Sequence, residues 1–407
     1  MFDPCEIRLE FPILERRIHN RRLVYFDNAA TTQKPACLLG TMQEAYNHYN
    51  ANIHRGVHTL SQESTERYEA ARKTVASYLN APDPRSVIFT SGATGAINLA
   101  AFCLAESFLK EGDAILVSEM EHHSNLVSWQ LVAERHKLRI IKWPINEAAQ
   151  LELNELPALL KQNVRIVAVT HVSNVTGIVN PIAEIAKTVH EHNALLFVDG
   201  AQGIKHYPID VQALGADFYA FSAHKIYGPL GVGVLWGRFE IMNAFHPWQG
   251  GGEMVGRVSF EKTTYAELPF RLEAGTPSYV SAIGLATALA FYRTLNEEYG
   301  QDIAAHEAEL LHTAYEAVKG LGGICYGYTP TNSAILSFNF PHVHHFDLGT
   351  LLDQMGIAVR TGTHCAEPFM TRFGITGTVR ASFAFYNTRE EVTYFATSLK
   401  QALEMLS

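Results

Sequence analysis

The 407-residue sequence predicts an α/β protein whose large domain holds a mainly parallel, seven-stranded sheet. Seven apolar runs alternate with helical patterns such as residues 181–193, where apolar positions recur at three- and four-residue intervals. Strands that are apolar on both faces are typical of a parallel sheet covered by helices on each side. No internal repeat and no low-complexity linker points to a solenoid or to a string of small domains.

The apolar runs occur in an order that defines the large domain. In chain order they are residues 86–90, 114–119, 139–145, 164–173, 194–201, 217–223 and 231–237. A short Gly-Pro-Leu-Gly loop at 228–231 separates the last two runs, and antiparallel strands can be joined by so short a connection. These two strands are therefore the place where the sheet can depart from parallel pairing.

A second α+β region follows a long helical pattern at residues 280–300. It contains an apolar run at 332–340, a helix that opens at Asp347 and another apolar run at 378–387. The first 20 residues are expected to pack on this region. The predicted division is a large domain at 21–285 and a smaller α+β domain formed by 1–20 with 286–407.

Composition and charge favour a small-molecule substrate or a protein partner. The net charge of −9 repels the phosphates of nucleic acids and anionic lipids, and the longest apolar stretch meets Glu106 before it could cross a bilayer. The first residues lack the pattern of a secretion signal, so a cytoplasmic protein is expected. The cysteines show no paired spacing, which predicts free thiols and no metal site: Cys5, Cys37, Cys103, Cys325 and Cys365.

Polar residues stand at or just after the carboxyl ends of three buried runs, which is where open parallel sheets bind ligands. These residues are Asn174, Asp199, Gln202 and Lys225. Burial would lower the pKa of the Lys225 amine toward that of an imine-forming nucleophile, and a plain surface lysine is the alternative. Asp199 could keep a pyridine ring protonated, and a helix cap or strand-end turn is the alternative.

Two further segments could contact a cofactor. In "TSGATG" (90–95) a strand leads through glycines into a helix that begins near Ala93, so backbone amides and the Thr94 hydroxyl could bind a phosphate. An ordinary helix cap is the alternative, and neither the Walker nor the dinucleotide pattern matches. His122 and His123 lack the further ligands of a zinc site, so a ring packed flat against a cofactor is favoured.

Taken together, these motifs resemble the pyridoxal-phosphate enzymes of fold type I, in the class V aminotransferase family. The resemblance is strongest to the group II cysteine desulfurases of the SufS and CsdA type, with the neighbouring selenocysteine lyases, and it covers almost the whole chain. The matching segments are "YFDNAATTQKP" (25–35), "NIHRGVHTLS" (52–61), "EHHSNLVSW" (121–129), "SNVTG" (173–177), "VDGAQ" (198–202), "SAHKIYGPLGVGVL" (222–235), "GGGEM" (250–254), "EAGTPS" (273–278), "RTGTHCAEP" (360–368) and "VRASFAFYNT" (379–388).

The resemblance implies a role for each matching residue. Lys225 would form the imine with pyridoxal 5'-phosphate, Asp199 would pair with the ring nitrogen, and His123 would stack on the ring and move protons. Other cofactor contacts would come from Ala93, Thr94, Gln202, Ser222, His224 and, across a dimer, Thr276. The substrate carboxylate would be held by Asn174, Arg360 and Arg380. Cys365 would be the nucleophile, since nearby Arg360, and His364 if it is charged, favour its thiolate, although a lone cysteine can also be a small buried apolar residue.

The implied activity is conversion of L-cysteine to L-alanine, with the sulfur passed to Cys365 as a persulfide for iron–sulfur cluster assembly. A homodimer is implied, as is a SufE/CsdE-like or SufU-like sulfur-acceptor protein. The chain departs from the family at 91–95, where "SGATG" replaces the usual "RGTTE", so Ser91, Ala93 and Gly95 lack those side chains. We expect the backbone cradle to persist with weaker cofactor affinity. Thr363 stands where histidine or glutamine is common, which leaves the sulfur acceptor open.

Three alternatives remain open at this point. The chain could be a selenocysteine lyase, because selenide can leave without the help of a thiol. It could be an aminotransferase or another β-lyase with the same cofactor. It could also be a non-catalytic scaffold or a peroxide-sensing thiol protein, which would be colourless.

Overall fold

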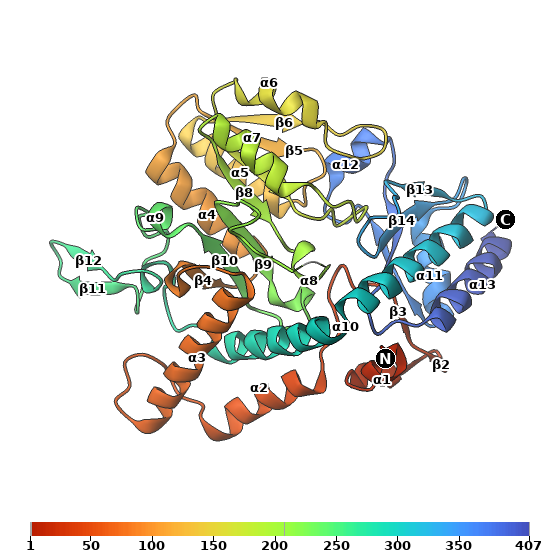
Figure 1. The fold of residues 1–407 in the computed structure, drawn as a ribbon, viewed down its shortest axis with the longest axis horizontal. Helices are drawn as coiled ribbons and strands as arrows, with labels where there is room; N and C mark the ends of the chain where they lie inside the picture. The colour runs from red at the N-terminus through yellow and green to blue at the C-terminus, as the bar shows by residue number, and fades with distance from the viewer. Residues whose placement is uncertain (1, 207, 407) are drawn as a thin grey trace.

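A computed structural model describes residues 2–206 and 208–406. Its central element is a seven-stranded sheet with the strand order β4-β10-β9-β8-β7-β5-β6 (Figure 1). The seven strands fall on the seven predicted runs, and the prediction of fold class is confirmed. Their bounds are β4 (Val87–Thr90), β5 (Ala114–Ser118), β6 (Arg139–Trp143), β7 (Val164–Thr170), β8 (Leu195–Asp199), β9 (Phe218–Ser222) and β10 (Gly233–Gly237).

The sheet is parallel except at strand β10. Strands β6, β5, β7, β8 and β9 pair in parallel, whereas β10 runs antiparallel to both β9 and β4. The expected antiparallel pair at the Gly-Pro-Leu-Gly loop is therefore present. Parallel pairing brings the carboxyl ends of β7, β8 and β9 to one edge, because Thr170 is in register with Asp199 and Asp199 with Ala220.

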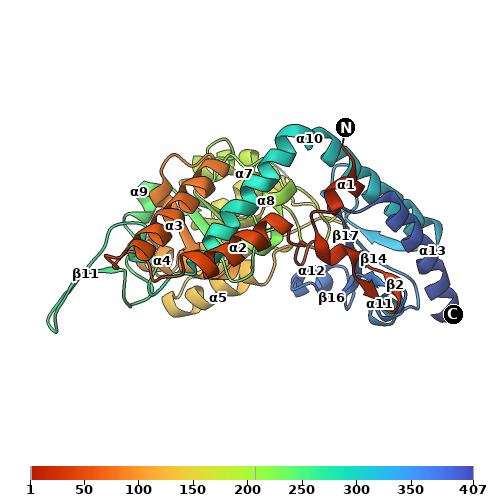
Figure 2. The ribbon, with the colours of Figure 1, turned by 90° about the horizontal axis from the view of Figure 1, so that it is seen from below.

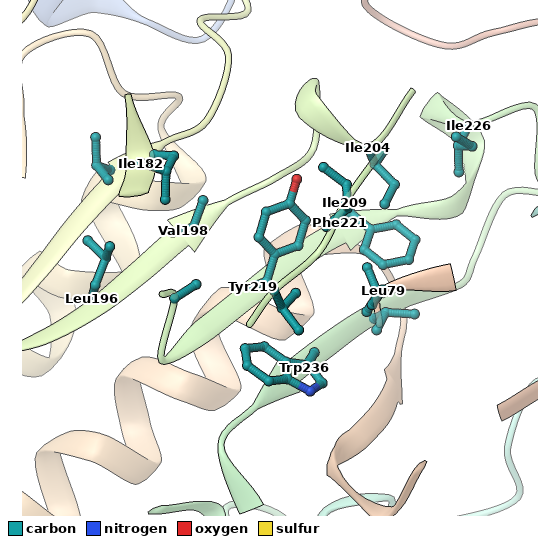
Figure 3. Packing of buried hydrophobic residues seen from close by; sticks show 14 of the residues in the cluster. Leu79, Ile182, Leu196, Val198, Ile204, Ile209, Tyr219, Phe221, Ile226 and Trp236 are labelled. Carbon is teal, nitrogen blue, oxygen red and sulfur yellow. The ribbon is translucent and has the colours of Figure 1, made fainter. Parts of the chain in front are cut away.

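Helices cover both faces of the sheet, and alternate strand residues divide between two cores. On one face, α4 (Ala93–Phe108) and α5 (Ser124–His136) pack over residues such as Ile115 and Phe197. On the other face, α3 (Thr59–Tyr78), α7 (Ile182–Glu191) and the first half of α10 (Tyr279–Gly320) pack over residues such as Leu196 and Phe221. Figure 3 shows part of this second core, where Leu79 and Ile182 gather with Val198, Tyr219 and Trp236.

Smaller elements complete the part of the chain around the large sheet. The helices are α2 (Ala36–His48), α6 (Leu156–Leu160), α8 (Gly203–His206) and α9 (Phe239–Met242). Strands β11 (Val255–Val258) and β12 (Thr263–Tyr265) form a hairpin that projects away from the rest of the molecule (Figure 2). Among the described residues, no helix is both long and apolar enough to cross a membrane.

A second, antiparallel sheet lies at the other end of the molecule, with the order β13-β14-β17-β16 (Figures 1 and 2). Helix α10 runs unbroken from the large sheet to this region, 20 residues beyond the predicted end at 300, because its second half also buries apolar residues such as Leu310 and Val318. The bounds are β13 (Ile324–Tyr326), β14 (Ile335–Asn339), β16 (Arg360–Gly362), β17 (Thr378–Ser382), α11 (His345–Gln354), α12 (Glu367–Arg372) and α13 (Arg389–Leu406).

The N-terminal segment contacts this second region. Helix α1 (Pro4–Arg8) carries Arg8, whose guanidinium lies 2.8 Å from the Glu391 carboxylate. The segment continues through the short strands β1 (Arg17–Ile18) and β2 (Arg21–Arg22) to β3 (Val24–Tyr25), which pairs in parallel with β15 (Ile357–Ala358). The division into domains at residues 20 and 285 stays a prediction, since α10 is continuous across the second boundary.

Lys205 is a buried lysine between the two regions, and its burial leads to a prediction about how stability depends on pH. Lys205 is only 2 % exposed, and its amine has no hydrogen-bond partner among the described residues. Burial lowers the pKa of Lys205 to about 8, although the Glu307 carboxylate opposes this shift. The unfolded chain, in which the pKa is near 10.5, therefore binds the proton more tightly. The free-energy cost of burying the protonated Lys205 amine is fully present below about pH 8 and decreases as the pH rises toward 10.5.

We therefore expect Lys205→Met to raise the free energy of unfolding at pH 7 by roughly 1–3 kcal/mol, because the penalty disappears with the amine. The advantage over the wild type should shrink between pH 8 and pH 10.5. Urea unfolding of both proteins at pH 7 and pH 10 measures the difference. A variant that is less stable than the wild type at pH 7 would show that the Lys205 amine is stabilising where it lies.

Candidate active site

A cavity of about 210 Å³ lies at the carboxyl edge of the large sheet, between that sheet and the second region. Ten of the predicted site residues line it: Ala93, Thr94, Asn174, Asp199, Ser222, His224, Lys225, Arg360, Cys365 and Arg380. Three predicted residues do not line it: His123, Gln202 and Thr276. The cavity therefore brings the amine at position 225 and the thiol at position 365 to the same space.

Lys225 ends a short 3-10 turn that follows strand β9. The carbonyl oxygen of His224, directly before it, accepts hydrogen bonds from the Thr32 backbone N–H at 3.0 Å and from the Lys34 amine at 3.1 Å. The hydroxyls of Thr31 and Thr32 add two more donors, each at 3.1 Å. These contacts fix the peptide that precedes Lys225. The segment 31–34 thus determines where the Lys225 side chain leaves the backbone.

Lys225 and Asp199 influence each other's charge. Burial lowers the pKa of the Lys225 amine, and the carboxylate of Asp199 opposes that shift. Burial raises the pKa of Asp199, whereas Lys225 and a hydrogen bond from the Ala201 N–H at 2.9 Å lower it. Asp199 is 5 % exposed at the end of β8. The pair is suited to hold a cationic ring and a reactive amine in one place.

The predicted phosphate cradle lies where β4 leads into α4. Gly92 adopts a φ of 151°, which side chains rarely allow, and helix α4 begins at the next residue. The Ala93 N–H donates to the Ser222 hydroxyl at 2.7 Å, and the Thr94 and Ser124 hydroxyls are 2.7 Å apart. Hydroxyls and helix N–H groups thus converge here, and a phosphate cradle formed by backbone groups stays a prediction.

The structure places the two adjacent histidines differently relative to the cavity. His122 lines the cavity, whereas the His123 imidazole contacts the Glu367 carboxylate and lies outside the cavity. The reason is that the two residues lie at the start of α5, where consecutive side chains point in different directions. His122 Nδ1 accepts from the Ser124 N–H at 3.1 Å, so the neutral ring carries its proton on Nε2. Burial, followed by the charge of Lys225, lowers the pKa of His122 to about 3.

Cys365 lies in a four-residue loop between β16 and α12 and is exposed. Both His364 (φ 54°) and Cys365 (φ 57°) have left-handed backbone conformations, which cost energy in non-glycine residues. Three hydrogen bonds hold this conformation: Asn174 Nδ2 to the His364 carbonyl at 2.8 Å, the His123 N–H to the Cys365 carbonyl at 2.7 Å, and His364 Nε2 with the Thr378 hydroxyl at 2.8 Å. The loop is thus short and held from several sides.

Two arginines reach the cavity from the second sheet. Arg380 on β17 is 2 % exposed and donates from Nη1 to the Asn174 carbonyl at 2.7 Å. Its Nε atom is buried without a hydrogen-bond partner in the described part of the chain. Burial lowers the pKa of Arg380 to about 10, so the group stays positively charged near neutral pH. Arg360 on β16 is half-exposed and lies on the same side of the cavity.

The remaining two predicted residues, Gln202 and Thr276, do not line the cavity. Gln202 is buried, and its Nε2 donates to the carbonyl of Ala29, which does line the cavity. Its Oε1 has no hydrogen-bond partner among the described residues. Thr276 lines a separate cavity of about 340 Å³ together with Ser91 and Gly95, two of the positions that depart from the family. A role for Thr276 at the active site would therefore require a second subunit.

Sequence reasoning missed three residues at this site. His122 is the third residue after the expected strand end at 119 and stands next to His123, so the sequence offers the two histidines equally. His364 lines the cavity and is buried, which its position next to Cys365 does not reveal. Asp27 contacts both arginines across more than 330 residues of sequence, and only its place in the segment 25–35 could have suggested it.

Comparison with known proteins agrees with this geometry. The model of the family described as aminotransferase class-V matches residues 24–395. The chain belongs to the class V aminotransferase family. Enzymes of this family use pyridoxal 5'-phosphate.

Relatives of the chain are named cysteine desulfurases. It is 46% identical over 401 residues to "Probable cysteine desulfurase" of Vibrio cholerae, covering 98% of each chain. It is 43% identical over 408 residues to "Cysteine desulfurase" of Klebsiella pneumoniae, covering 100% of this chain and 99% of the relative.

Solved structures agree as well. The cysteine desulfurase CsdA of Escherichia coli, in an S-sulfonic acid form, matches with a TM-score of 0.91 and 40% identity, covering 100% of both chains. An apo cysteine desulfurase of Thermococcus onnurineus NA1 matches with a TM-score of 0.93 and 36% identity, covering 100% of this chain and 99% of that one. The predicted resemblance to the cysteine desulfurases of this family is confirmed.

Proposed function

We propose that this protein is a pyridoxal-phosphate-dependent cysteine desulfurase, which converts L-cysteine to L-alanine and keeps the sulfur on Cys365. One observation carries the proposal: Lys225 and Cys365 line the same cavity, together with two arginines. An aminotransferase needs no thiol at this place. A thiol-based sensor needs neither a buried amine nor an arginine pair.

The residues of the cavity fit the cofactor. Buried polar atoms without a hydrogen-bond partner in the described chain include His224 Nδ1, Gln202 Oε1 and Arg380 Nε, and all three lie in or beside the cavity. Lys225 and Asp199 would hold the aldehyde and the ring nitrogen, and His122 would pack on the ring. The phosphate would be bound by Thr94, Ser222, His224 and the N–H groups that begin α4. When bound, the cofactor supplies an electron sink for the bonds at the substrate α-carbon.

The protein's own groups account for the other steps. Arg380 and Arg360 bind the carboxylate of L-cysteine, with Asn174 beside them. Lys225, with its lowered pKa, takes the α-proton on Nζ.

The thiolate of Cys365 then attacks the substrate sulfur. A new S–S bond forms and the substrate C–S bond breaks. The electron pair of that bond stays with carbon, which is protonated to give alanine. The reaction is balanced without an external oxidant.

We further propose a homodimer and a sulfur-acceptor protein of the SufE/CsdE or SufU kind, with iron–sulfur cluster assembly as the destination. The β11–β12 hairpin supports a subunit interface, because it carries the fully exposed Phe260 and the exposed Val258 on a projecting element (Figure 2). The exposed Cys365 supports transfer to a docked protein. Location in the cytoplasm and the absence of nucleic acid and membrane partners stay predictions from the sequence.

The proposal is tested on the purified protein with its cofactor. We expect a visible absorption band, and we expect L-cysteine to yield equal amounts of L-alanine and transferable sulfur, with sulfide released when a reductant is present. Alanine and sulfide can be measured in parallel over time. A coloured protein that forms pyruvate or an amino-group transfer product from L-cysteine, without alanine, would instead support a β-lyase or an aminotransferase.

The two adjacent histidines offer a matched pair of variants. We expect His122→Ala to lower kcat/KM for L-cysteine by about 10²-fold and to weaken cofactor retention, because this imidazole faces the cavity. His123→Ala should lower kcat/KM less than about fivefold, since it loses only the contact with Glu367 and keeps its backbone bond to Cys365. Steady-state kinetics and cofactor content separate them. The opposite ranking would restore the role predicted for His123 from the sequence.

A further inference from the structure

Asp27 lies between the two arginines of the cavity. Its Oδ1 atom accepts a hydrogen bond from Arg360 Nε at 3.2 Å and from Arg380 Nη2 at 3.3 Å. Its Oδ2 atom lies 3.3 Å from the same Arg360 Nε. A single carboxylate therefore bridges two guanidinium groups. Burial lowers the pKa of Arg380 most, Asp27 raises it, and the positive charge of Arg360 lowers it.

The two arginines depend on Asp27 to different degrees. Arg380 is buried and is also held by the Asn174 carbonyl at 2.7 Å. The Arg360 side chain is 48 % exposed, and within the described residues its guanidinium forms hydrogen bonds to Asp27. A long, exposed side chain without such a partner samples many rotamers, and ordering it opposes ligand binding. Asp27 orders the Arg360 side chain in advance. The entropy cost of ordering it therefore no longer opposes the binding of a substrate carboxylate.

The backbone around Asp27 is fixed to the second sheet, so its carboxylate has a defined place. Asp27 forms a parallel bridge with Ser382 of the same strand that carries Arg380. Asn28 Nδ2 donates to the Ser382 carbonyl at 2.7 Å, and the Ala29 N–H donates to the Ser382 hydroxyl at 2.8 Å. Ala29 and Ala30 themselves line the cavity. The N-terminal segment therefore delivers Asp27 to the arginine pair as part of the cavity wall.

We propose that Asp27 is a positioning residue that holds the Arg360 and Arg380 guanidiniums side by side for the carboxylate of an amino-acid substrate. The inference rests on the proposed function only in its choice of L-cysteine as that substrate. The predicted change in affinity for the substrate carboxylate is opposite in direction to the change that charge alone would cause. Removal of one negative charge would by itself strengthen binding of an anion, whereas loss of the positioning contact weakens it.

The test compares Asp27→Asn and Asp27→Ala with the wild-type holoenzyme. We expect the KM for L-cysteine to rise at least about tenfold in both variants, with kcat within about threefold of the wild type. The Kd for L-alanine, read from the change in the visible spectrum, should rise by a similar factor and does not depend on turnover. Asp353→Asn is the control, because Asp353 is an exposed carboxylate that pairs with His19 outside the cavity. It should change none of these values.

Formate provides a second readout that a merely structural role would not produce. It should inhibit the wild type by competing for the arginines. At low millimolar concentration it should lower the KM of Asp27→Ala, where it can occupy the vacated space, but not that of Asp27→Asn, where the amide fills that space.

Three results decide the matter. A KM and alanine Kd that stay constant or fall in both folded, cofactor-loaded variants would overturn the inference, as would formate inhibition of Asp27→Ala equal to that of the wild type. A wild type that binds alanine but does not convert L-cysteine would defeat the proposed function alone, and the alanine Kd would still decide the role of Asp27.

Discussion

Replacement of Cys365 by serine is expected to lower the rate of alanine and persulfide formation from L-cysteine by about 10³-fold or more, because a hydroxyl is a poor nucleophile toward sulfur near neutral pH. The cofactor spectrum and the melting temperature should be unchanged, since the Cys365 side chain is exposed and the loop is held by backbone contacts and the His364 ring. Assays of alanine and sulfide on the wild type and the variant measure the loss.

Cys5→Ser serves as the matched control, because Cys5 is another exposed thiol and lies outside the cavity. It should keep full activity. A Cys365→Ser variant that retained normal turnover would contradict the desulfurase account. Selenocysteine separates the neighbouring alternative: if the variant loses activity on cysteine but keeps it on selenocysteine, the thiol is needed only for sulfur, and the selenocysteine lyase alternative gains support.

Replacement of Lys225 by arginine is expected to lower the turnover of L-cysteine at least about 10³-fold. Arginine stays protonated and can neither form an imine nor accept the α-proton. In the wild type, borohydride should bleach the visible band and add the mass of the reduced cofactor to the peptide that contains Lys225. The variant should show no such adduct. Absorption spectra and peptide mass spectra together make the measurement.

Lys205→Met is the matched control for this second prediction, since Lys205 is also buried on the same edge of the sheet but lines no part of the cavity. It should keep the borohydride adduct on Lys225 and keep its turnover. An adduct on another lysine in the wild type, or full activity in Lys225→Arg, would refute the assignment of Lys225.

The sheet could be predicted from the sequence because each strand is a continuous apolar run bounded by polar or glycine residues. Strand β8, for example, is apolar up to Asp199, and its burial in the structure follows from helices on both faces. The same logic placed Lys225 and Asn174 at one edge, since parallel strands end together. The end of α10 was less predictable, because charged residues such as Glu298 and Asp302 interrupt the apolar pattern near residue 300, while residues beyond it such as Leu310 are buried.

The parts of the site that the sequence could not supply depend on contacts between distant segments. Nothing local distinguishes His122 from His123, and the choice is made by how the first turn of α5 meets the loop of Cys365. Asp27 reaches the arginines through pairing of β3 with β15 and a bridge to Ser382, which no periodicity encodes. The resemblance to a known family indicated the chemical roles of the residues. Only the three-dimensional arrangement shows which side chains face one another.

The central claim is that the amine of Lys225 and the thiol of Cys365 act on one substrate molecule in one cavity. It is tested most directly by mixing the holoenzyme with L-cysteine for a single turnover, alkylating, digesting and analysing the peptides by mass spectrometry. The account predicts one extra sulfur atom on the peptide that carries Cys365, matched by one alanine per active site, and neither product in Lys225→Arg. Alanine formed in the wild type with the extra sulfur absent from Cys365, or present on another cysteine, would contradict it.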